Sequence, residues 1–218
     1  PLTHEAGATK ILIGYARAGL PVHTGEHPIA GFSAPITLAG TLIVQNAEVL
    51  SGMLIGYLAN PETRFLYGIT TSNADMRTGI TLSGSVEVAL LGVGAVQVAK
   101  YYNFPVQVPS GTESKIPDAQ AGLERMLTFI PQALAGADVI AFRQLELQHT
   151  FSYEQLVIDN DLMRIVTRLV RGIEVNDRTL ATGLIHEVGP GGTFLNKKHT
   201  IDYFDGEHIL SLIHISEP

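Results

Sequence analysis

The stretch 105-PVQVPSGTESKIPD-118 passes from a short apolar run, through a polar and charged loop, to an aspartate suited to cap a helix. Three other apolar runs are followed by polar loops in the same way. The four runs are Leu20 to His23, Phe65 to Ile69, Pro105 to Val108 and Asp138 to Phe142. This rhythm predicts a parallel sheet covered by helices. Because loops after parallel strands leave the same edge of a sheet, their side chains should meet at one mouth.

Apolar periodicity and capping residues predict the helices between these runs. The predicted helices cover residues 5–18, 37–59, 85–102, 118–137, 152–171 and 177–187, and a last helix begins near His199. The second of these is apolar on nearly all sides, but Gln45, Asn46 and Glu48 at its centre would be costly in lipid. We therefore expect a buried helix and no membrane span.

The number of strands leaves two architectures open. An eight-stranded (β/α)₈ barrel typically takes about 250 residues, and four predicted strands are too few to close one. The residues alone therefore indicate an α/β chain that is either part of a barrel or an open sheet.

Composition excludes several classes of function. The chain has 218 residues, of which 45% are hydrophobic and 16% charged, so a globular fold is expected. A net charge of −7 argues against a nucleic-acid partner, which needs clustered Lys and Arg. Zero cysteine excludes disulfides and cysteine-ligated zinc and fits a reducing compartment such as the cytoplasm. No signal-peptide pattern is visible at the start.

Both ends of the chain look irregular. The first residues, PLTHEAGATK, lack Met and begin in mid-pattern, which suggests a fragment. The last residues, ILSLIHISEP, form an apolar run without a cap and read like translated adapter sequence. We predict one domain over residues 1–204 and a non-native or unstructured tail over 205–218.

Three tempting motifs are weak. The glycine-rich run Val188 to Thr193 follows a helix and lacks a P-loop lysine, which favours a tight connection over a phosphate site. The eight histidines show no HExxH spacing, so no metal site is expected. His23 and His27 flank a turn, where a histidine is more often a surface hydrogen-bonding group. No GxSxG elbow of a hydrolase appears.

Two charged loops are better candidates. The loop after Val108 places Glu113 and Lys115 between a strand and a helix, where a pocket and a solvated rim are equally plausible. For Asp75 and Arg77, an internal salt bridge that orders the loop is slightly favoured over catalysis.

Six long segments, taken together, resemble the trimethylamine methyltransferase family, which includes the glycine betaine methyltransferases. They are PITLAGTLIVQNAEVLSG, DMRTGITLSGSVEVAL, SKIPDAQAGLERMLT, ALAGADVI, SYEQLVIDND and EVGPGGTFLNKKHT. The resemblance covers about Glu5 to Tyr203. It implies a partial TIM (β/α)₈ barrel that holds only the later βα units, since members are about twice this length.

The resemblance also implies an activity. Members move a methyl group from a methylated amine to the cobalt of a separate corrinoid protein, as in methanogenesis, and this chain would bind no metal itself. Some members carry pyrrolysine, whereas every residue here is standard. A quaternary amine such as glycine betaine is therefore favoured over trimethylamine, because it leaves as a neutral tertiary amine without further activation. The alternative is a non-catalytic member that binds a betaine-like cation or docks a partner; a homo-oligomer stays open.

A quaternary ammonium has no N–H donor, so aromatic faces and carboxylates must recognise it. On this basis Glu113, Lys115 and Glu146 are predicted as catalytic, and Phe32, Tyr67, Asp75, Arg77 and Phe142 as substrate-binding. Ordinary packing is the competing interpretation for the three aromatic residues. The chain departs from its relatives at RQLELQHTF, residues 143–151, where they read similarly to a glycine-rich LESGLT. Glu146 matches the acid of that segment, while Gln148 and His149 add bulk.

Overall fold

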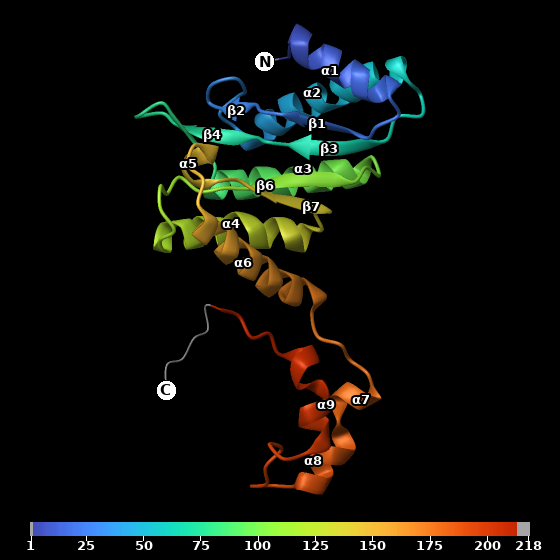
Figure 1. The fold of residues 1–218 in the computed structure, drawn as a ribbon, viewed down its shortest axis with the longest axis vertical. Helices are drawn as coiled ribbons and strands as arrows, with labels where there is room; N and C mark the ends of the chain where they lie inside the picture. Colours follow the sequence, from blue (N-terminus) through green and yellow to red (C-terminus); the bar gives the residue numbers. More distant parts are fainter. Residues whose placement is uncertain (1, 213–218) are drawn as a thin grey trace. The chain divides into compact units, whose positions relative to one another are not determined.

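The structure is a computed structural model that describes residues 2–212 (Figure 1). The chain divides into two compact units between Asp159 and Asn160. The helices are α1 (Ala6–Arg17), α2 (Leu38–Ala59), α3 (Val86–Tyr101), α4 (Ala119–Ala135), α5 (Leu145–Gln148), α6 (Tyr153–Arg171), α7 (Asp177–Leu180), α8 (Thr182–Val188) and α9 (Lys198–Glu207). The strands are β1 (Val22–Glu26), β2 (Ile29–Ala30), β3 (Phe65–Ile69), β4 (Ser72–Asp75), β5 (Ile80–Leu82), β6 (Val106–Ser110) and β7 (Val139–Phe142).

The main sheet contains the four predicted strands. They lie in the order β1-β3-β6-β7, and every neighbouring pair is parallel. The prediction of a helix-covered parallel sheet is thus confirmed. The strand order always advances in one direction, so right-handed crossovers place the three connecting helices on the same face. Accordingly α2 packs on β1 and β3, α3 on β3 and β6, and α4 on β6 and β7.

The helix starts follow from the predicted capping residues. The Ser85 hydroxyl accepts a hydrogen bond from the Val88 amide, and the Asp118 carboxylate accepts one from the Ala121 amide at 2.9 Å. Each side chain satisfies an amide that has no partner inside its helix. The prediction that these two residues begin α3 and α4 is confirmed.

Helix α2 is long and apolar enough to cross a membrane by length and composition alone. Its fully buried residues include Gln45 and Val49, and they recur at helical spacing on the side that faces the sheet. This arrangement agrees with the expected core helix, which passes the same composition test.

A second, smaller sheet was not predicted. It has the order β2-β4-β5, with β2 and β4 parallel and β4 and β5 antiparallel. Its strands are short, and β4 reads Ser-Asn-Ala-Asp, so it carries no apolar run to mark it in the sequence. Its formation turns the expected loop around Asp75 into a hairpin.

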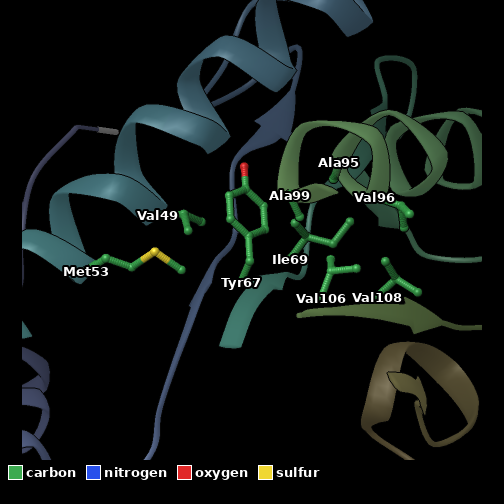
Figure 2. Packing of buried hydrophobic residues seen from close by; sticks show 9 residues of the cluster. All are labelled: Val49, Met53, Tyr67, Ile69, Ala95, Val96, Ala99, Val106 and Val108. Atoms are coloured by element: carbon green, nitrogen blue, oxygen red, sulfur yellow. The ribbon is translucent and has the colours of Figure 1, made fainter. Parts of the chain in front are cut away.

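Alternation along the strands sends successive side chains to opposite faces of the main sheet. The face toward the helices carries the core, which includes Tyr67, Ile69, Val106 and Val108. Figure 2 shows the Tyr67 ring rising from β3 between α2 and α3, with Val106 and Val108 of β6 to its right. The Tyr67 hydroxyl donates to the Asn46 Oδ1 atom at 3.0 Å. Its burial raises the pKa of the phenol, and the neutral form persists in the core.

The opposite face of the main sheet, here called the open face, carries the alternate residues of the same strands. They are His23, Gly25, Leu66, Gly68, Gln107, Pro109, Val139 and Ala141. Val139 is 43% exposed and His23 is also exposed. The His23 ring lies so close to Gly68 that a Cβ there would be 2.0 Å from its Nε2 atom. Gly68 is therefore required for this ring to lie flat on the sheet.

The second unit contains short helices. The helix expected over 177–187 is broken at Ala181, where φ is 48°, into α7 and α8. Helix α9 extends through Glu207, so the first three residues of the predicted tail are helical. The rest of that prediction falls partly on residues 213–218, which lie outside the described residues. The domain boundary at residue 204 stays a prediction.

Substituting Tyr67 should affect stability first. Tyr67→Ala removes a fully buried ring and is expected to lower the free energy of unfolding by about 3 to 5 kcal/mol. Tyr67→Phe removes only the hydroxyl and should cost about 1 kcal/mol. Urea unfolding measures both, with Tyr101→Phe, which is 85% exposed, as the neutral control. A Tyr67→Ala variant as stable as the parent would contradict this placement.

Candidate functional site

The loops that follow β1, β3, β6 and β7 leave one edge of the parallel sheet, and we call this edge the rim. It brings together segments as distant in sequence as residues 26–28, 70–72, 110–118 and 143–150. The carboxyl ends of parallel strands are where ligands bind in α/β proteins. The three residues predicted as catalytic all lie in these loops.

Glu113 connects two loops of the rim. Its Oε1 atom accepts hydrogen bonds from the Ser83 amide, from the Ser83 hydroxyl at 2.8 Å and from the Gly84 amide at 3.1 Å. The side chain is half-buried. These bonds tie the loop after β6 to the loop before α3, so Glu113 has a clear structural task in addition to any chemical one.

Glu146 and Lys115 form an ion pair at the rim, with 3.1 Å between Nζ and Oε1. The Glu146 Oε2 atom accepts from the Thr150 hydroxyl at 2.7 Å. The hydrogen bond from Thr150 and that from Lys115 lower the pKa of Glu146, which keeps the carboxylate charged. The Lys115 side chain is 75% exposed and that of Glu146 is 35% exposed, so solvent reaches this pair.

Two predicted substrate-binding residues lie elsewhere. Tyr67 is fully buried among α2, α3 and β6, and does not reach the rim. Phe142 points to the helix side, where its ring packs edge-to-face on the Phe129 ring of α4, with 4.9 Å between the ring centroids. The predicted placement at the rim is therefore wrong for both, because strand alternation assigns them to the covered face. For them the competing interpretation, ordinary packing, is correct.

The other predicted substrate-binding residues lie on the surface. Phe32, in the turn after β2, is 53% exposed. Asp75 and Arg77 form an ion pair of 3.4 Å within the turn that joins β4 to β5, and the Arg77 side chain is 90% exposed. The Arg77 amide also donates to Asp75 Oδ1 at 2.9 Å. This confirms the salt bridge that orders the loop, which the sequence slightly favoured.

Arg125 is a buried residue that sequence reasoning missed. It is 0% exposed, and its Nε atom lies 3.3 Å from Asp159 Oδ1 of α6. Its Nη1 atom donates to the Ser110 carbonyl at 2.7 Å, and its Nη2 atom donates to the Arg143 carbonyl. The guanidinium also lies 5.6 Å from the Phe142 ring centroid. Arg125 thus fixes the ends of β6 and β7, which carry the rim loops.

Arg143 and His27 are also rim residues that the predicted site omits. Arg143 follows β7 and is 7% exposed, and its Nη2 atom donates to the Thr70 carbonyl at 3.0 Å. The His27 Nε2 atom lies 2.8 Å from the Ser72 hydroxyl. Loss of hydration, followed by the nearby positive charge of Arg143, lowers the pKa of His27. The sequence signal that could have placed Arg143 at the rim is its position directly after the apolar run of β7.

The loop at 146–148 has an unusual backbone. Glu146, Leu147 and Gln148 have φ of 49°, 54° and 78°, a region that residues other than glycine rarely adopt. The Glu146 and Leu147 amides hold this loop by donating to the Ser114 and Thr112 carbonyls at 2.9 and 3.1 Å. In the LESGLT segment expected from the resemblance, a glycine follows the acid by two residues, as Gln148 follows Glu146 here. A glycine would adopt φ near 78° without the steric cost that Gln148 bears.

Two other features do not add a site. Within residues 2–212, no group of three or more His, Asp or Glu could hold a metal ion. A cavity of about 790 Å³ in the second unit is lined by α6, α9 and His208 to Leu210. None of its lining residues belongs to the rim loops, so this cavity does not add to the site.

The fold and rim define an α/β protein with a polar mouth at the carboxyl ends of parallel strands, a common layout of enzymes. Comparison with known families is more specific, because residues 1–215 match the family model described as Trimethylamine methyltransferase (MTTB). The chain belongs to this family.

Curated relatives support this membership. The chain is 41% identical over 208 residues to trimethylamine methyltransferase MttB of Methanosarcina thermophila, covering 93% of this chain and 43% of the relative. It is 41% identical over 202 residues to trimethylamine methyltransferase MttB of Desulfitobacterium hafniense strain DCB-2, covering 92% of this chain and 41% of the relative. It is 36% identical over 203 residues to a glycine betaine methyltransferase of Desulfitobacterium hafniense strain Y51, covering 92% of this chain and 42% of the relative. The chain therefore spans about two-fifths of the length of these relatives.

Gln148→Gly should stabilise the protein. Glycine adopts φ near 78° without the steric cost that Gln148 bears, so the free energy of unfolding is expected to rise by about 1 kcal/mol. His149→Gly is the matched control, because His149 has φ of −86° and should lose about 0.5 to 1 kcal/mol instead. Equal losses in both variants, measured by urea unfolding, would contradict the strained loop.

The His27 ring should titrate below its ordinary pKa of 6.5, as followed by NMR. A lowered pKa means that the unfolded chain binds more protons between the folded pKa and 6.5. The free energy of unfolding should therefore rise with pH across that window, and His27→Gln should flatten the rise. Arg143→Met should raise the pKa of His27 by removing a like charge. A His27 pKa at or above 6.5 in the parent would refute this environment.

Proposed function

We propose that this chain is part of a corrinoid-dependent methyltransferase that demethylates a quaternary amine. Family membership over residues 1–215 is the observation that carries the proposal. In the reaction, the methyl–nitrogen bond breaks and its electron pair stays on nitrogen, which leaves as a neutral tertiary amine. The methyl group passes to the reduced cobalt of a corrinoid that a separate, cytoplasmic protein presents at the rim.

The winding of the sheet supports a partial (β/α)₈ barrel. In a doubly wound sheet the strand order reverses and helices cover both faces. Here the order β1-β3-β6-β7 never reverses, and the connecting helices lie on one face only. A parallel sheet is normally buried on both faces. We infer that the remaining βα units of the complete protein close the barrel over the open face.

The ion pair of Lys115 and Glu146 supports a role in holding the cation. Glu146 is the more accessible of the two predicted catalytic acids, since Glu113 is bound to Ser83 and Gly84. A quaternary ammonium near Glu146 would replace the exposed Lys115 ammonium as the counter-ion of this carboxylate. Lys115 therefore holds the carboxylate charged until the substrate arrives.

Methyl transfer to added cob(I)alamin tests the proposal, followed by loss of the cobalt(I) absorbance. Glycine betaine should support transfer, and trimethylamine should not. Glu146→Gln is expected to raise KM about tenfold, which corresponds to the loss of about 1.4 kcal/mol of charge attraction. Glu62→Gln is the matched control, because Glu62 is exposed and lies in the turn that enters β3, at the opposite end of this strand from the rim.

Two results would contradict the proposal. Binding of glycine betaine without any transfer would favour the non-catalytic alternative. Equal KM values for Glu146→Gln and Glu62→Gln would remove Glu146 from the site while leaving the activity in place.

A further inference from the structure

Arg143 is a buried charge without a contacting counter-ion. Its side chain is almost wholly buried, yet no carboxylate of the described residues forms an ion pair with it. Burying a guanidinium without a partner is costly. Arg125, the other deeply buried arginine, shows the usual solution, because it pairs with Asp159.

The nearest acid does not complete the pair. Glu113 is close enough to act on the Arg143 charge, but its oxygens accept hydrogen bonds from Ser83 and Gly84. Of the Arg143 donors, Nη2 is bound to the Thr70 carbonyl. The other guanidinium nitrogens are absent from the buried polar atoms that lack a hydrogen-bond partner, so they reach solvent. They can therefore donate to a ligand at the rim.

Strand alternation places Arg143 on the open face. Phe142 packs on α4, so the next residue points to the other side of the sheet. The register continues from His27 to Thr70, Pro109 and Ala141 across the four strands, and Arg143 follows Ala141 by two residues. Its side chain then runs back along the rim, across β6, to the end of β3.

The open face carries a permanent positive charge at the strand ends, that of Arg143. His23 and His27 also lie there, but loss of hydration lowers the pKa of both rings, so they act as neutral hydrogen-bonding groups. The acidic strand residue Glu26 lies on the helix side near Glu48. No residue of β1, β3, β6 or β7 places a Phe, Tyr or Trp ring on this face, since Phe65, Tyr67 and Phe142 point to the helices. The Arg143 charge therefore suits an anion, and the strand residues of this face offer no aromatic ring to an onium group.

We propose that Arg143 binds a carboxylate of the substrate and that this chain acts on a methylated amine which also carries a carboxylate. The inference rests on the proposed function and adds the specificity residue. A carboxylate matches the planar, two-pronged guanidinium. His27 adds a second hydrogen-bonding group beside it. Residues on this face thus recognise the acidic end of a zwitterion, with its onium methyl directed toward Glu146 and the open mouth.

Calorimetry on the 218-residue chain with three probes tests the inference. Glycine betaine carries both groups, choline carries the same onium group with a hydroxyl in place of the carboxylate, and acetate carries the carboxylate alone. The parent should bind glycine betaine at least about tenfold more tightly than choline, a range typical of charged hydrogen bonds. Arg143→Met should abolish this preference without changing the choline affinity.

Thermal unfolding separates a binding role from a structural one. Arg143→Met replaces an unpaired buried charge by an apolar chain of similar length, so its Tm without ligand should equal or exceed that of the parent. Arg125→Met is the matched control, because it leaves Asp159 buried and unpaired and should lower Tm. A Tm loss in Arg143→Met as large as that in Arg125→Met would overturn the inference.

The binding results are decisive on their own. Equal affinities for glycine betaine and choline, or no binding of glycine betaine, would overturn the inference even where methyl transfer occurs. Arg143-dependent binding of glycine betaine without methyl transfer would sustain the inference and refute the catalytic proposal. Binding of acetate as tightly as glycine betaine would assign Arg143 to a general anion site and would also overturn the substrate class.

Discussion

In the sheet β1-β3-β6-β7 each new strand is added at the same edge, and the right-handed crossovers expected of parallel strands return the connecting helices on one side. This winding gives the two faces of every strand different environments. Side chains that point toward α2, α3 and α4 form a close-packed apolar core. Side chains that point the other way, and the loops at the carboxyl ends, remain available for a ligand. The position of a residue in the alternation therefore decides whether it can take part in chemistry.

Two buried arginines show how this constraint divides structure from function. Arg125 extends from α4 beneath the strand ends, pairs with Asp159 and holds the carbonyls of Ser110 and Arg143. Arg143, on the opposite face, has its backbone fixed by Arg125, and its side chain forms no ion pair with an acid among residues 2–212. Arg125 therefore stabilises the positions of the rim loops. Arg143 carries a positive charge that can still bind a ligand.

The relatives of this chain are named after two different substrates. Some are named trimethylamine methyltransferases and one is named a glycine betaine methyltransferase. Trimethylamine has no acidic group, whereas glycine betaine is a zwitterion. In this chain the loop at 146–148 has three residues with left-handed backbone conformation, and Glu146 of this loop forms the ion pair with Lys115. The proposed carboxylate recognition by Arg143 would separate these two kinds of substrate.

By itself the sequence determined the four parallel strands, the longer helices, their caps at Ser85 and Asp118, and the family, because these depend on local periodicity and on long runs of matching residues. It also located Glu113, Lys115 and Glu146 in loops at one edge. It could not assign Tyr67 and Phe142 to the covered face, since an aromatic residue in an apolar strand reads the same on either side. Only the tertiary structure decided that, and with it the pairing of Arg125, the exposure of the face that holds His27, and the lack of an ion pair at Arg143 within the described part of the chain. The physical reason is that these properties depend on which residues distant in sequence become neighbours, and local patterning does not encode that.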